Sequence, residues 1–196
     1  RYRTDFAMPI IAVGGSNGKT TTKELLAAVL RQKLVTLASE ASFNNDIGVP
    51  LTLLRLEAAH RVAVLEVGTN HPGELAPLVR MIQPKFGVIT SLGREHLEFF
   101  GDRDGVLKEE GWLAELLPAD GKLFVNVDDD DLERIAQRSR APIVRVGRSD
   151  KCDWRARDIR LDKQRVWFQV EAPKAEFAGE YMIHLLGRHQ VVNALF

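Results

Sequence analysis

The feature that most constrains the fold is a glycine-rich loop between an apolar run and an amphipathic segment. The loop consists of Gly15, Ser16, Asn17, Gly18, Lys19 and Thr20. Residues 9–13 before it are apolar, which predicts a buried strand, and the apolar residues of segment 20–34 recur on one helical face, which predicts a helix. A strand, a glycine turn and a helix form the opening unit of a parallel α/β fold.

The same loop has the chemistry of a phosphate site. Glycines let backbone N–H groups turn toward an anion without a Cβ in the way, and the start of the helix adds free donors and a positive dipole end. Lys19 is expected to reach the β- and γ-phosphates of a nucleotide, and the Thr20 hydroxyl to bind Mg²⁺. Val13 stands where the longer motif has its first glycine, so the loop fits the shorter form G-x-x-G-K-T. The alternative, a glycine turn with an exposed lysine, is disfavoured by the Gly-Lys-Thr-Thr-Thr run after an apolar strand.

Strands and helices alternate over the first 147 residues. Further strands are expected over residues 62–65, 86–90, 122–127 and 143–146, and further helices over residues 75–82, 104–117 and 132–138. This alternation predicts a parallel sheet that helices cover on both faces.

The pattern changes after Gly147. Three strand-like segments follow without helices between them, over residues 153–161, 165–172 and 181–186, and residues 187–196 have a helical pattern. We therefore expect an α/β fold with two parts. A P-loop-type parallel sheet flanked by helices is expected over about residues 9–147, and a small appended antiparallel sheet over about residues 152–187.

Composition argues against several classes of protein. The 27 basic and 27 acidic residues cancel, so the chain has no overall electrostatic attraction to nucleic acid or to an anionic membrane. The absence of a run of about 18 apolar residues predicts no membrane insertion. The single cysteine, Cys152, cannot form an internal disulfide, so the fold does not depend on an oxidising compartment. Together these features favour a cytoplasmic protein.

Two polar side chains follow predicted strands. Glu66 comes directly after strand 62–65, and ligands of parallel sheets bind beyond the carboxyl ends of the strands. Glu66 is therefore expected near the phosphate loop, where Mg²⁺ needs an oxygen ligand, although a solvated carboxylate at a strand end is the alternative. His96 follows strand 86–90 by a few residues, and a hydrogen-bonded loop histidine explains it as well as a metal ligand does.

Glu110 has an unusual place in the helix expected over residues 104–117. It lies on the same face as three apolar residues, Val106, Leu113 and Leu117, so its carboxylate is expected to face the interior and to have a cation partner. The alternative is an edge position from which the charge reaches water. Lys108 and Glu109 are expected to lie on the solvated surface. The run 128–131 is expected to be a solvated loop and helix N-cap, with a ribose contact as an alternative.

Five segments of the chain resemble motifs of the Mur ligase family. They are residues 15–23, 43–53, 66–74, 96–101 and 187–195. The resemblance runs from about Pro9 to the end of the chain. The Asn-Asn-Asp-Ile-Gly-Val-Pro and Asn-His-Pro-Gly-Glu segments are similar to those of the branch that adds D-alanyl-D-alanine to UDP-N-acetylmuramoyl-tripeptide.

The resemblance implies that residues 1–196 form the central, ATP-binding domain of a cytoplasmic, amide-forming ligase of peptidoglycan synthesis, with a six-stranded parallel sheet. ATP and Mg²⁺ would activate the carboxylate of the UDP-muramoyl tripeptide as an acyl phosphate, which the amine of D-Ala-D-Ala attacks to give an amide, ADP and phosphate. The family's N-terminal domain, which binds the uridine nucleotide, and its C-terminal domain are not expected within this chain. We therefore expect the chain alone to bind nucleotide weakly and not to turn over.

The resemblance also implies roles for single residues. The implied ATP-binding residues are Gly15, Ser16, Asn17, Gly18, Lys19, Thr20, Thr21 and, at the adenine, Asn193. The implied catalytic residues are Lys19, Asn45, Glu66, His96 and Glu110, with Asn45 near the transferring phosphate. Thr20 and Glu66 would bind one Mg²⁺, and His96 a second one with Glu110. Asn70 and His71 are expected to contact the substrate.

Two positions depart from the family pattern. Members usually carry a carbamylated lysine where this chain has Glu110, which supplies the same charge and two oxygens on a side chain shorter by roughly 3–4 Å. Gln190 replaces the usual asparagine of the last motif. Two alternatives therefore stay open. One is another Mur-like ligase of the cyanophycin or folylpolyglutamate type, which the Asn-His-Pro-Gly-Glu segment argues against, and the other is a nucleotide-binding but inactive scaffold.

Overall fold

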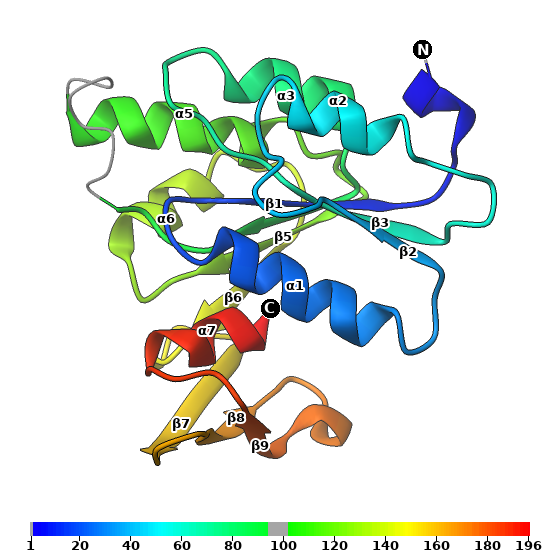
Figure 1. The fold of residues 1–196 in the computed structure, drawn as a ribbon. Coiled ribbons are helices and arrows are strands. Elements are labelled where there is room, and N and C mark those ends of the chain that lie inside the picture. The colour runs from blue at the N-terminus through cyan, green and yellow to red at the C-terminus, as the bar shows by residue number, and fades with distance from the viewer. Residues whose placement is uncertain (1, 94–101) are drawn as a thin grey trace.

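Nine strands form one continuous sheet in the computed structural model, which describes residues 2–93 and 102–196 (Figure 1). In their order across the sheet, the strands are β2 (Thr36–Ala38), β3 (Val62–Glu66), β1 (Ile10–Gly14), β4 (Phe86–Ile89), β5 (Lys122–Asn126), β6 (Ile143–Gly147), β7 (Trp154–Leu161), β8 (Val166–Glu171) and β9 (Gly179–Ile183). Strands β1 to β6 pair in parallel, whereas β8 pairs antiparallel with both β7 and β9. The expected α/β fold, with a six-stranded parallel part and an antiparallel extension, is confirmed.

Strand β7 joins the two parts of the sheet. Its first two residues, Trp154 and Arg155, pair in parallel with Val146 and Gly147 at the end of β6. The rest of β7 runs antiparallel to β8. The antiparallel strands therefore extend the same sheet.

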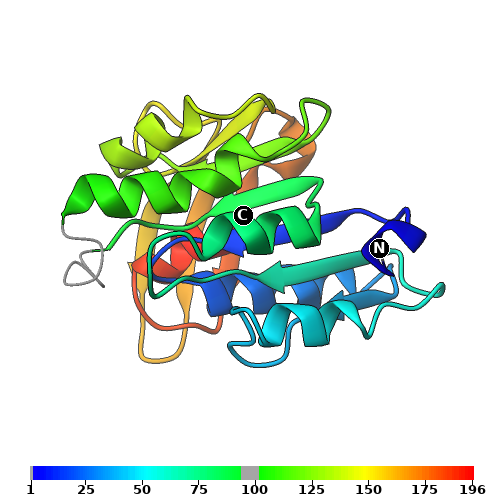
Figure 2. The ribbon, with the colours of Figure 1, turned by 90° about the horizontal axis from the view of Figure 1, so that it is seen from above.

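Helices cover both faces of the parallel strands (Figures 1 and 2). One face carries α2 (Gly48–Leu53), α3 (Leu75–Ile82), α5 (Arg103–Glu115) and α6 (Asp130–Ala136), and the other carries α1 (Lys19–Leu30) and α7 (His189–Leu195). On the first face Leu65 of β3 belongs to the same buried cluster as Leu78 of α3 and Leu113 of α5. On the second face Val13 and Val64 pack with Leu26 of α1. Because β3 is buried on both sides, all five of its residues are buried.

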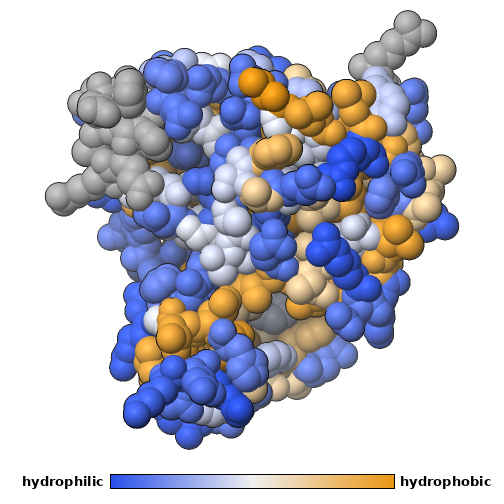
Figure 3. Space-filling model, viewed as in Figure 1, coloured by the Kyte–Doolittle hydropathy of each residue, from blue (hydrophilic) through white to orange (hydrophobic). Residues whose placement is uncertain are grey.

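Two short elements of the parallel part were not expected from the sequence. Strand β2 has only three residues, and α2 has six with a proline among them. Not all apolar side chains in and around α2 face the core: Phe43, Ile47, Leu51 and Leu54 are exposed. Apolar surface is visible in this region in Figure 3.

Two 3-10 helices complete the described chain, η1 (Tyr2–Asp5) and η2 (Ala175–Phe177).

The order of the strands determines where a ligand can bind. Strand β1 lies between β3 and β4, so the chain leaves β1 toward one side of the sheet and later returns to its other side. In open parallel sheets this reversal opens a crevice at the carboxyl ends of the strands. The phosphate loop, Glu66 and Thr90 all follow or end strands at that edge. Within residues 2–93 and 102–196, no helix has both the length and the apolar character needed to span a membrane.

Candidate nucleotide and metal site

The phosphate loop connects the carboxyl end of β1 to α1 and is held by the end of β4. Its backbone N–H groups at Ser16 and Asn17 donate to the carbonyl oxygen and to the Oγ of Ser91, at 2.8 and 3.0 Å. The Thr90 hydroxyl donates to the carbonyl oxygen of Asn17 at 2.6 Å. The loop is thereby fixed before any nucleotide binds.

Two glycines of the loop occupy positions that disfavour a side chain. Gly15 and Gly18 have φ angles of 108° and 89°, in the left-handed region that side chains disfavour. A Cβ at Gly15 would lie 2.6 Å from Oγ1 of Thr90, and a Cβ at Gly18 would lie 2.4 Å from Oδ1 of Asn193. The glycines therefore allow the backbone to turn and allow Thr90 and Asn193 to approach the loop closely.

Lys19 is the first residue of α1, and its side chain folds back over the loop. Its Nζ donates to the carbonyl oxygens of Gly15 and Ser16, at 2.8 and 2.7 Å. The ammonium group therefore already lies on the loop on which phosphate oxygens would bind. Because the two carbonyls are uncharged, an anionic phosphate competes well for the lysine charge.

Glu66, the last residue of β3, is buried next to the start of α1. Its side chain and backbone are only 1% exposed. Its Oε2 accepts from the Thr20 hydroxyl at 2.9 Å, and its Oε1 accepts from Nδ2 of Asn44 at 2.9 Å. The backbone N–H of Glu66 donates to Oγ of Ser39 at 3.1 Å. Thr20 and Glu66, far apart in the sequence, thus lie in direct contact.

The donors around Glu66 suit a hard divalent cation. Among the described residues Glu66 takes part in no ion pair, and a buried carboxylate without a cation is costly. Its neighbours are a hydroxyl and an amide, which leave the negative charge uncompensated. No cluster of three or more His, Cys, Asp and Glu side chains that could hold a metal occurs in the described part of the chain. Mg²⁺ needs no such cluster, because one or two carboxylates with phosphate oxygens and water suffice.

Glu110 of α5 is buried, as expected, and the structure places its carboxylate against the phosphate loop. Its Oε2 accepts from the backbone N–H of Gly15 at 3.1 Å. Burial raises the pKa of Glu110 to about 6, although the charge of Lys19 and the hydrogen bond from Gly15 oppose the rise. The neighbouring charge of Glu109 acts in the same direction as burial. Lys19 supplies a nearby positive charge, but within the described residues it forms no ion pair with Glu110.

Glu109 contradicts the expectation of a surface position. It is 5% exposed, and its two carboxylate oxygens accept from the backbone N–H groups of Gly73 and Leu75, at 3.0 and 2.8 Å. Helix α5 packs against the sheet with one side and against α3 with another, so two adjacent positions are buried. A sequence pattern that assumes one buried face per helix misses this. Lys108, by contrast, is exposed as expected.

The loop before α3 carries Asn70 and His71, the residues expected to contact a substrate. Both are exposed, and their backbone N–H groups donate to Oε2 of Glu74, at 2.8 and 3.1 Å. Burial acts to raise the pKa of Glu74, but these hydrogen bonds outweigh it and hold the pKa below its ordinary value. Glu74 from inside the loop and Glu109 from α5 therefore both fix its shape. The structure leaves the substrate role of Asn70 and His71 a prediction.

The neighbouring residues Asn44 and Asn45 have different partners. Asn44 binds Glu66, whereas Oδ1 of Asn45 accepts from the backbone N–H groups of Ile47 and Gly48, at 3.3 and 2.9 Å. Asn45 thus lies at the start of α2, and its role near a transferring phosphate stays a prediction. The sequence showed two adjacent asparagines but not which of them would contact the carboxylate of Glu66. His96, the other expected metal ligand, lies outside the described residues.

A cavity of about 230 Å³ opens beside the phosphate loop. It is lined by Asn17, Gly18, Thr90, Ser91, Asn126, Asp128, Arg148, His189, Val192 and Asn193. Asn193 of α7 reaches Gly18 across this cavity, and its Nδ2 donates to Oε1 of Gln190 at 2.9 Å. The residue expected at the adenine therefore borders a cavity that adjoins the phosphate loop.

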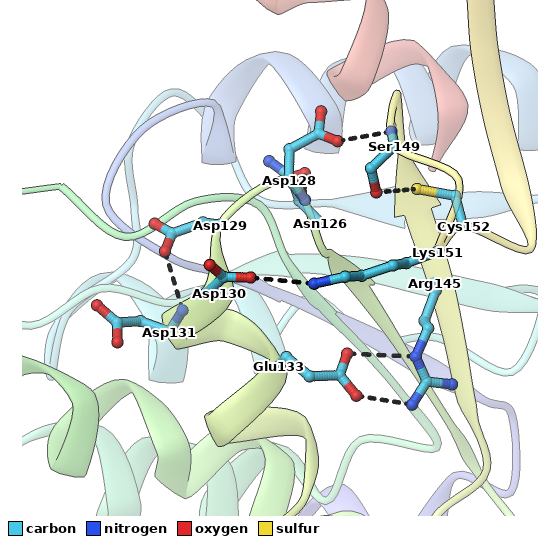
Figure 4. Close-up of polar contacts among 10 residues, drawn as sticks. All are labelled: Asn126, Asp128, Asp129, Asp130, Asp131, Glu133, Arg145, Ser149, Lys151 and Cys152. Atoms are coloured by element: carbon cyan, nitrogen blue, oxygen red, sulfur yellow. Dashed lines mark hydrogen bonds and ion pairs between the residues drawn. The ribbon is translucent and has the colours of Figure 1, made fainter.

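Asp128, in the wall of this cavity after β5, binds the segment after β6, and Figure 4 shows its contact with Ser149. Asp128 accepts from the backbone N–H groups of Arg148 and Ser149, at 2.8 and 3.0 Å, and pairs with the Arg148 guanidinium at 2.9 Å. Asp129 caps α6, as expected, by accepting from the N–H of Asp131. The carboxylate of Asp128 is thus engaged within the protein and joins the ends of β5 and β6.

Comparison with known proteins gives one consistent relationship. The family model described as "Mur ligase middle domain" matches residues 13–196. The UDP-N-acetylmuramoyl-tripeptide--D-alanyl-D-alanine ligase of Escherichia coli (strain K12) is 36% identical over 190 residues, which cover 95% of this chain and 41% of that protein. The chain therefore spans less than half the length of this relative.

Solved structures with the same fold agree with this result. The structure of MurF from Acinetobacter baumannii matches with a TM-score of 0.92 and 33% identity, over 99% of this chain and 42% of that one. MurF ligase from Thermotoga maritima, solved in complex with ADP, matches with a TM-score of 0.86 over 99% of this chain and 45% of that one. At 24% identity this second likeness shows the fold alone.

Proposed function

Because this chain belongs to the Mur ligase family, as its middle domain, we propose that it is the ATP-binding part of a ligase that joins D-alanyl-D-alanine to UDP-N-acetylmuramoyl-tripeptide. The observation that carries the proposal is the contact between the Thr20 hydroxyl and the buried carboxylate of Glu66 beside the Gly-Lys loop. A phosphate cradle, a lysine and a magnesium ligand are what ATP-dependent phosphoryl transfer requires. The reaction belongs to peptidoglycan precursor synthesis.

In the proposed reaction this chain positions ATP and neutralises charge. The phosphates of ATP bind along the N-terminus of α1, and Nζ of Lys19 exchanges its contacts with the Gly15 and Ser16 carbonyls for phosphate oxygens. The γ-phosphoryl group passes to the carboxylate of the muramoyl tripeptide. The amine of D-Ala-D-Ala then attacks the acyl phosphate, and phosphate leaves. Such chemistry depends on alignment rather than on a strong protein nucleophile.

Mg²⁺ would bind to the Thr20 hydroxyl and the Glu66 carboxylate. When bound, it neutralises part of the charge on the β- and γ-phosphates. Asn44 keeps one oxygen of Glu66 oriented while the other faces Thr20. Glu110, with His96, is proposed to serve a second metal. The contact of the Glu110 carboxylate with Gly15 of the phosphate loop supports this role.

The adenosine part of ATP is proposed to occupy the cavity beside Gly18, with Asn193 at the adenine. Asn70 and His71 are proposed to contact the peptide substrate from their exposed loop, and Asn45 to lie near the transferring phosphate. The chain spans 41% of the Escherichia coli relative, and we propose that the complete enzyme has further domains that bind the uridine nucleotide and close over ATP.

The test is a phosphate-release assay on the complete enzyme with ATP and Mg²⁺. The proposal predicts that release requires both the UDP-muramoyl tripeptide and D-Ala-D-Ala, and that the product is their amide. Release with a folate and glutamate, or with cyanophycin substrates, would instead identify another Mur-like ligase. Nucleotide binding without turnover under all these conditions would identify an inactive scaffold. The isolated chain is expected to bind nucleotide weakly and to form no amide.

A further inference from the structure

Lys23 is a charged residue in the interior of the protein that the proposed reaction does not use. It lies on α1 one turn after Thr20, and its side chain is fully buried, with 0% exposed. Lysine is rarely buried to this degree, because removing its charge from water costs several kcal/mol unless the ammonium group is well paired. Its position therefore calls for a physical reason.

The ammonium group of Lys23 binds the loop between β2 and α2. Its Nζ donates to the carbonyl oxygens of Ser39 and Ala41, at 2.9 and 2.6 Å, and pairs with the partly exposed Glu24 at 2.9 Å. Ala41 has a φ of 44°, a left-handed conformation that costs a non-glycine residue roughly 1–3 kcal/mol. The lysine thus holds a strained turn in place from within the protein.

The loop that Lys23 holds supplies two of the hydrogen bonds around Glu66. Ser39 accepts from the backbone N–H of Glu66, and Asn44 donates to Oε1 of its carboxylate. The third contact, from Thr20 to Oε2, comes from α1 itself. Helix α1 therefore orients Glu66 from two sides, directly through Thr20 and indirectly through Lys23 and the loop.

We propose that Lys23 is a positioning residue for the magnesium site, whose buried ammonium group fixes the 39–45 loop so that Ser39 and Asn44 orient the Glu66 carboxylate. The inference rests on the proposed function, because it requires Glu66 to bind Mg²⁺. It differs from a purely structural role in one respect. A structural lysine stabilises the fold alone, whereas a positioning lysine also sets the affinity of the site for metal.

The test measures ADP binding by calorimetry in the complete enzyme, with and without Mg²⁺, for the wild type, Lys23→Met and Lys23→Arg. Lys33→Met is the matched control, because Lys33 is exposed just beyond the end of the same helix. In Lys23→Met we expect metal-free ADP affinity to stay near the wild-type value. The Mg²⁺ concentration for half-maximal enhancement of ADP binding should rise by about 10-fold or more, as for other partners of metal ligands. Lys23→Arg keeps the charge and the donors, so this Mg²⁺ concentration should rise less than in Lys23→Met. In Lys33→Met it should stay at the wild-type value.

The outcomes separate this inference from the proposed function. A wild-type enzyme whose ADP binding does not respond to Mg²⁺ would overturn both. If Mg²⁺ strengthens ADP binding by the wild type, and a folded Lys23→Met variant needs the same Mg²⁺ concentration as the wild type, only the role of Lys23 is overturned. If the methionine variant does not fold, Lys23→Gln takes its place, because its amide can donate to one carbonyl. A higher Mg²⁺ requirement than in the wild type is again expected, since the charge and one donor contact are lost.

Discussion

At the scale of single residues, two buried carboxylates with different surroundings face the phosphate loop. Glu66 accepts hydrogen bonds from the neutral side chains of Thr20 and Asn44. Glu110 accepts one from the backbone of Gly15 and lies within the field of Lys19. Glu66 is therefore suited to bind a metal ion, whereas burial disfavours the charged form of Glu110 and only a nearby cation offsets this cost.

The raised pKa of Glu110 predicts a pH-dependent cost to stability in the nucleotide-free protein. Between about pH 4.5 and 6 the folded protein keeps a proton that the unfolded chain has released, so the contribution of Glu110 to the free energy of unfolding falls as pH rises through this window. Glu110→Gln does not titrate. Its stability relative to the wild type should therefore rise by up to about 2 kcal/mol from pH 4 to pH 7. Urea unfolding at several pH values measures this difference, and a difference that stays constant or falls with pH would refute the explanation.

The contacts of single side chains were the least predictable part of the site. The spacing of Gly15, Lys19 and Thr20 predicted a phosphate site, because that chemistry is confined to one short segment. The choice between Asn44 and Asn45 and the burial of Lys23 depend on a loop whose turn at Ala41 is strained. Local sequence patterns contain no information on such a loop, since its shape is imposed by the tertiary contacts of α1 and β3.

At the scale of elements, α5 connects two loops of the site through adjacent glutamates. Glu110 accepts from Gly15 of the phosphate loop, and Glu109 accepts from Gly73 and Leu75 at the start of α3. An anionic group at a helix N-terminus satisfies free N–H groups and interacts favourably with the helix dipole. Helix α5 therefore fixes the spacing between the phosphate loop and the loop of Asn70 and His71.

This connection predicts the effect of removing Glu109. Glu109→Ala leaves the buried N–H of Leu75 and the N–H of the exposed Gly73 without their acceptor, and should lower the free energy of unfolding by about 1–3 kcal/mol. Glu109→Gln keeps one acceptor oxygen and should lose less. Lys108→Ala, an exposed neighbour on the same helix, serves as the control and should stay within about 0.5 kcal/mol of the wild type. Denaturant unfolding measures the stability of all three variants. Equal losses for Glu109→Ala and Lys108→Ala would show that the hydrogen bonds from Gly73 and Leu75 to Glu109 do not stabilise the protein.

The longer elements were predictable from the sequence, and the shorter ones were not. β1, β3 and α5 have clear apolar patterns, and the structure has them within a few residues of the predicted bounds. β2 has only three residues and α2 only six, so neither is long enough to show a recurring pattern of apolar residues in the sequence. Glu109 was misplaced because α5 buries two sides.

At the scale of the whole molecule, the sheet gathers the site from distant parts of the chain. The carboxyl edge of the parallel strands supplies the phosphate loop, Glu66 and Thr90, whereas Asn193 arrives only after the chain has passed through β7, β8 and β9. Figure 1 shows α7 returning beside α1, where Asn193 approaches Gly18. The alternation of strands and helices predicted the parallel part, but this return depends on how the antiparallel strands fold back.

The central claim is that the Lys19 loop, with Thr20 and Glu66, binds a magnesium-complexed adenine nucleotide. Calorimetric titration of the complete enzyme with ADP, with and without Mg²⁺, tests it most directly when the wild type is compared with Lys19→Met and the exposed control Lys33→Met. The account predicts that Mg²⁺ strengthens ADP binding by the wild type and the control, and that Lys19→Met loses at least about 10-fold in affinity for Mg·ADP, as expected when charge-assisted contacts to phosphate are removed. Absence of ADP binding by the wild type in the presence of Mg²⁺, or unchanged binding by Lys19→Met, would contradict it.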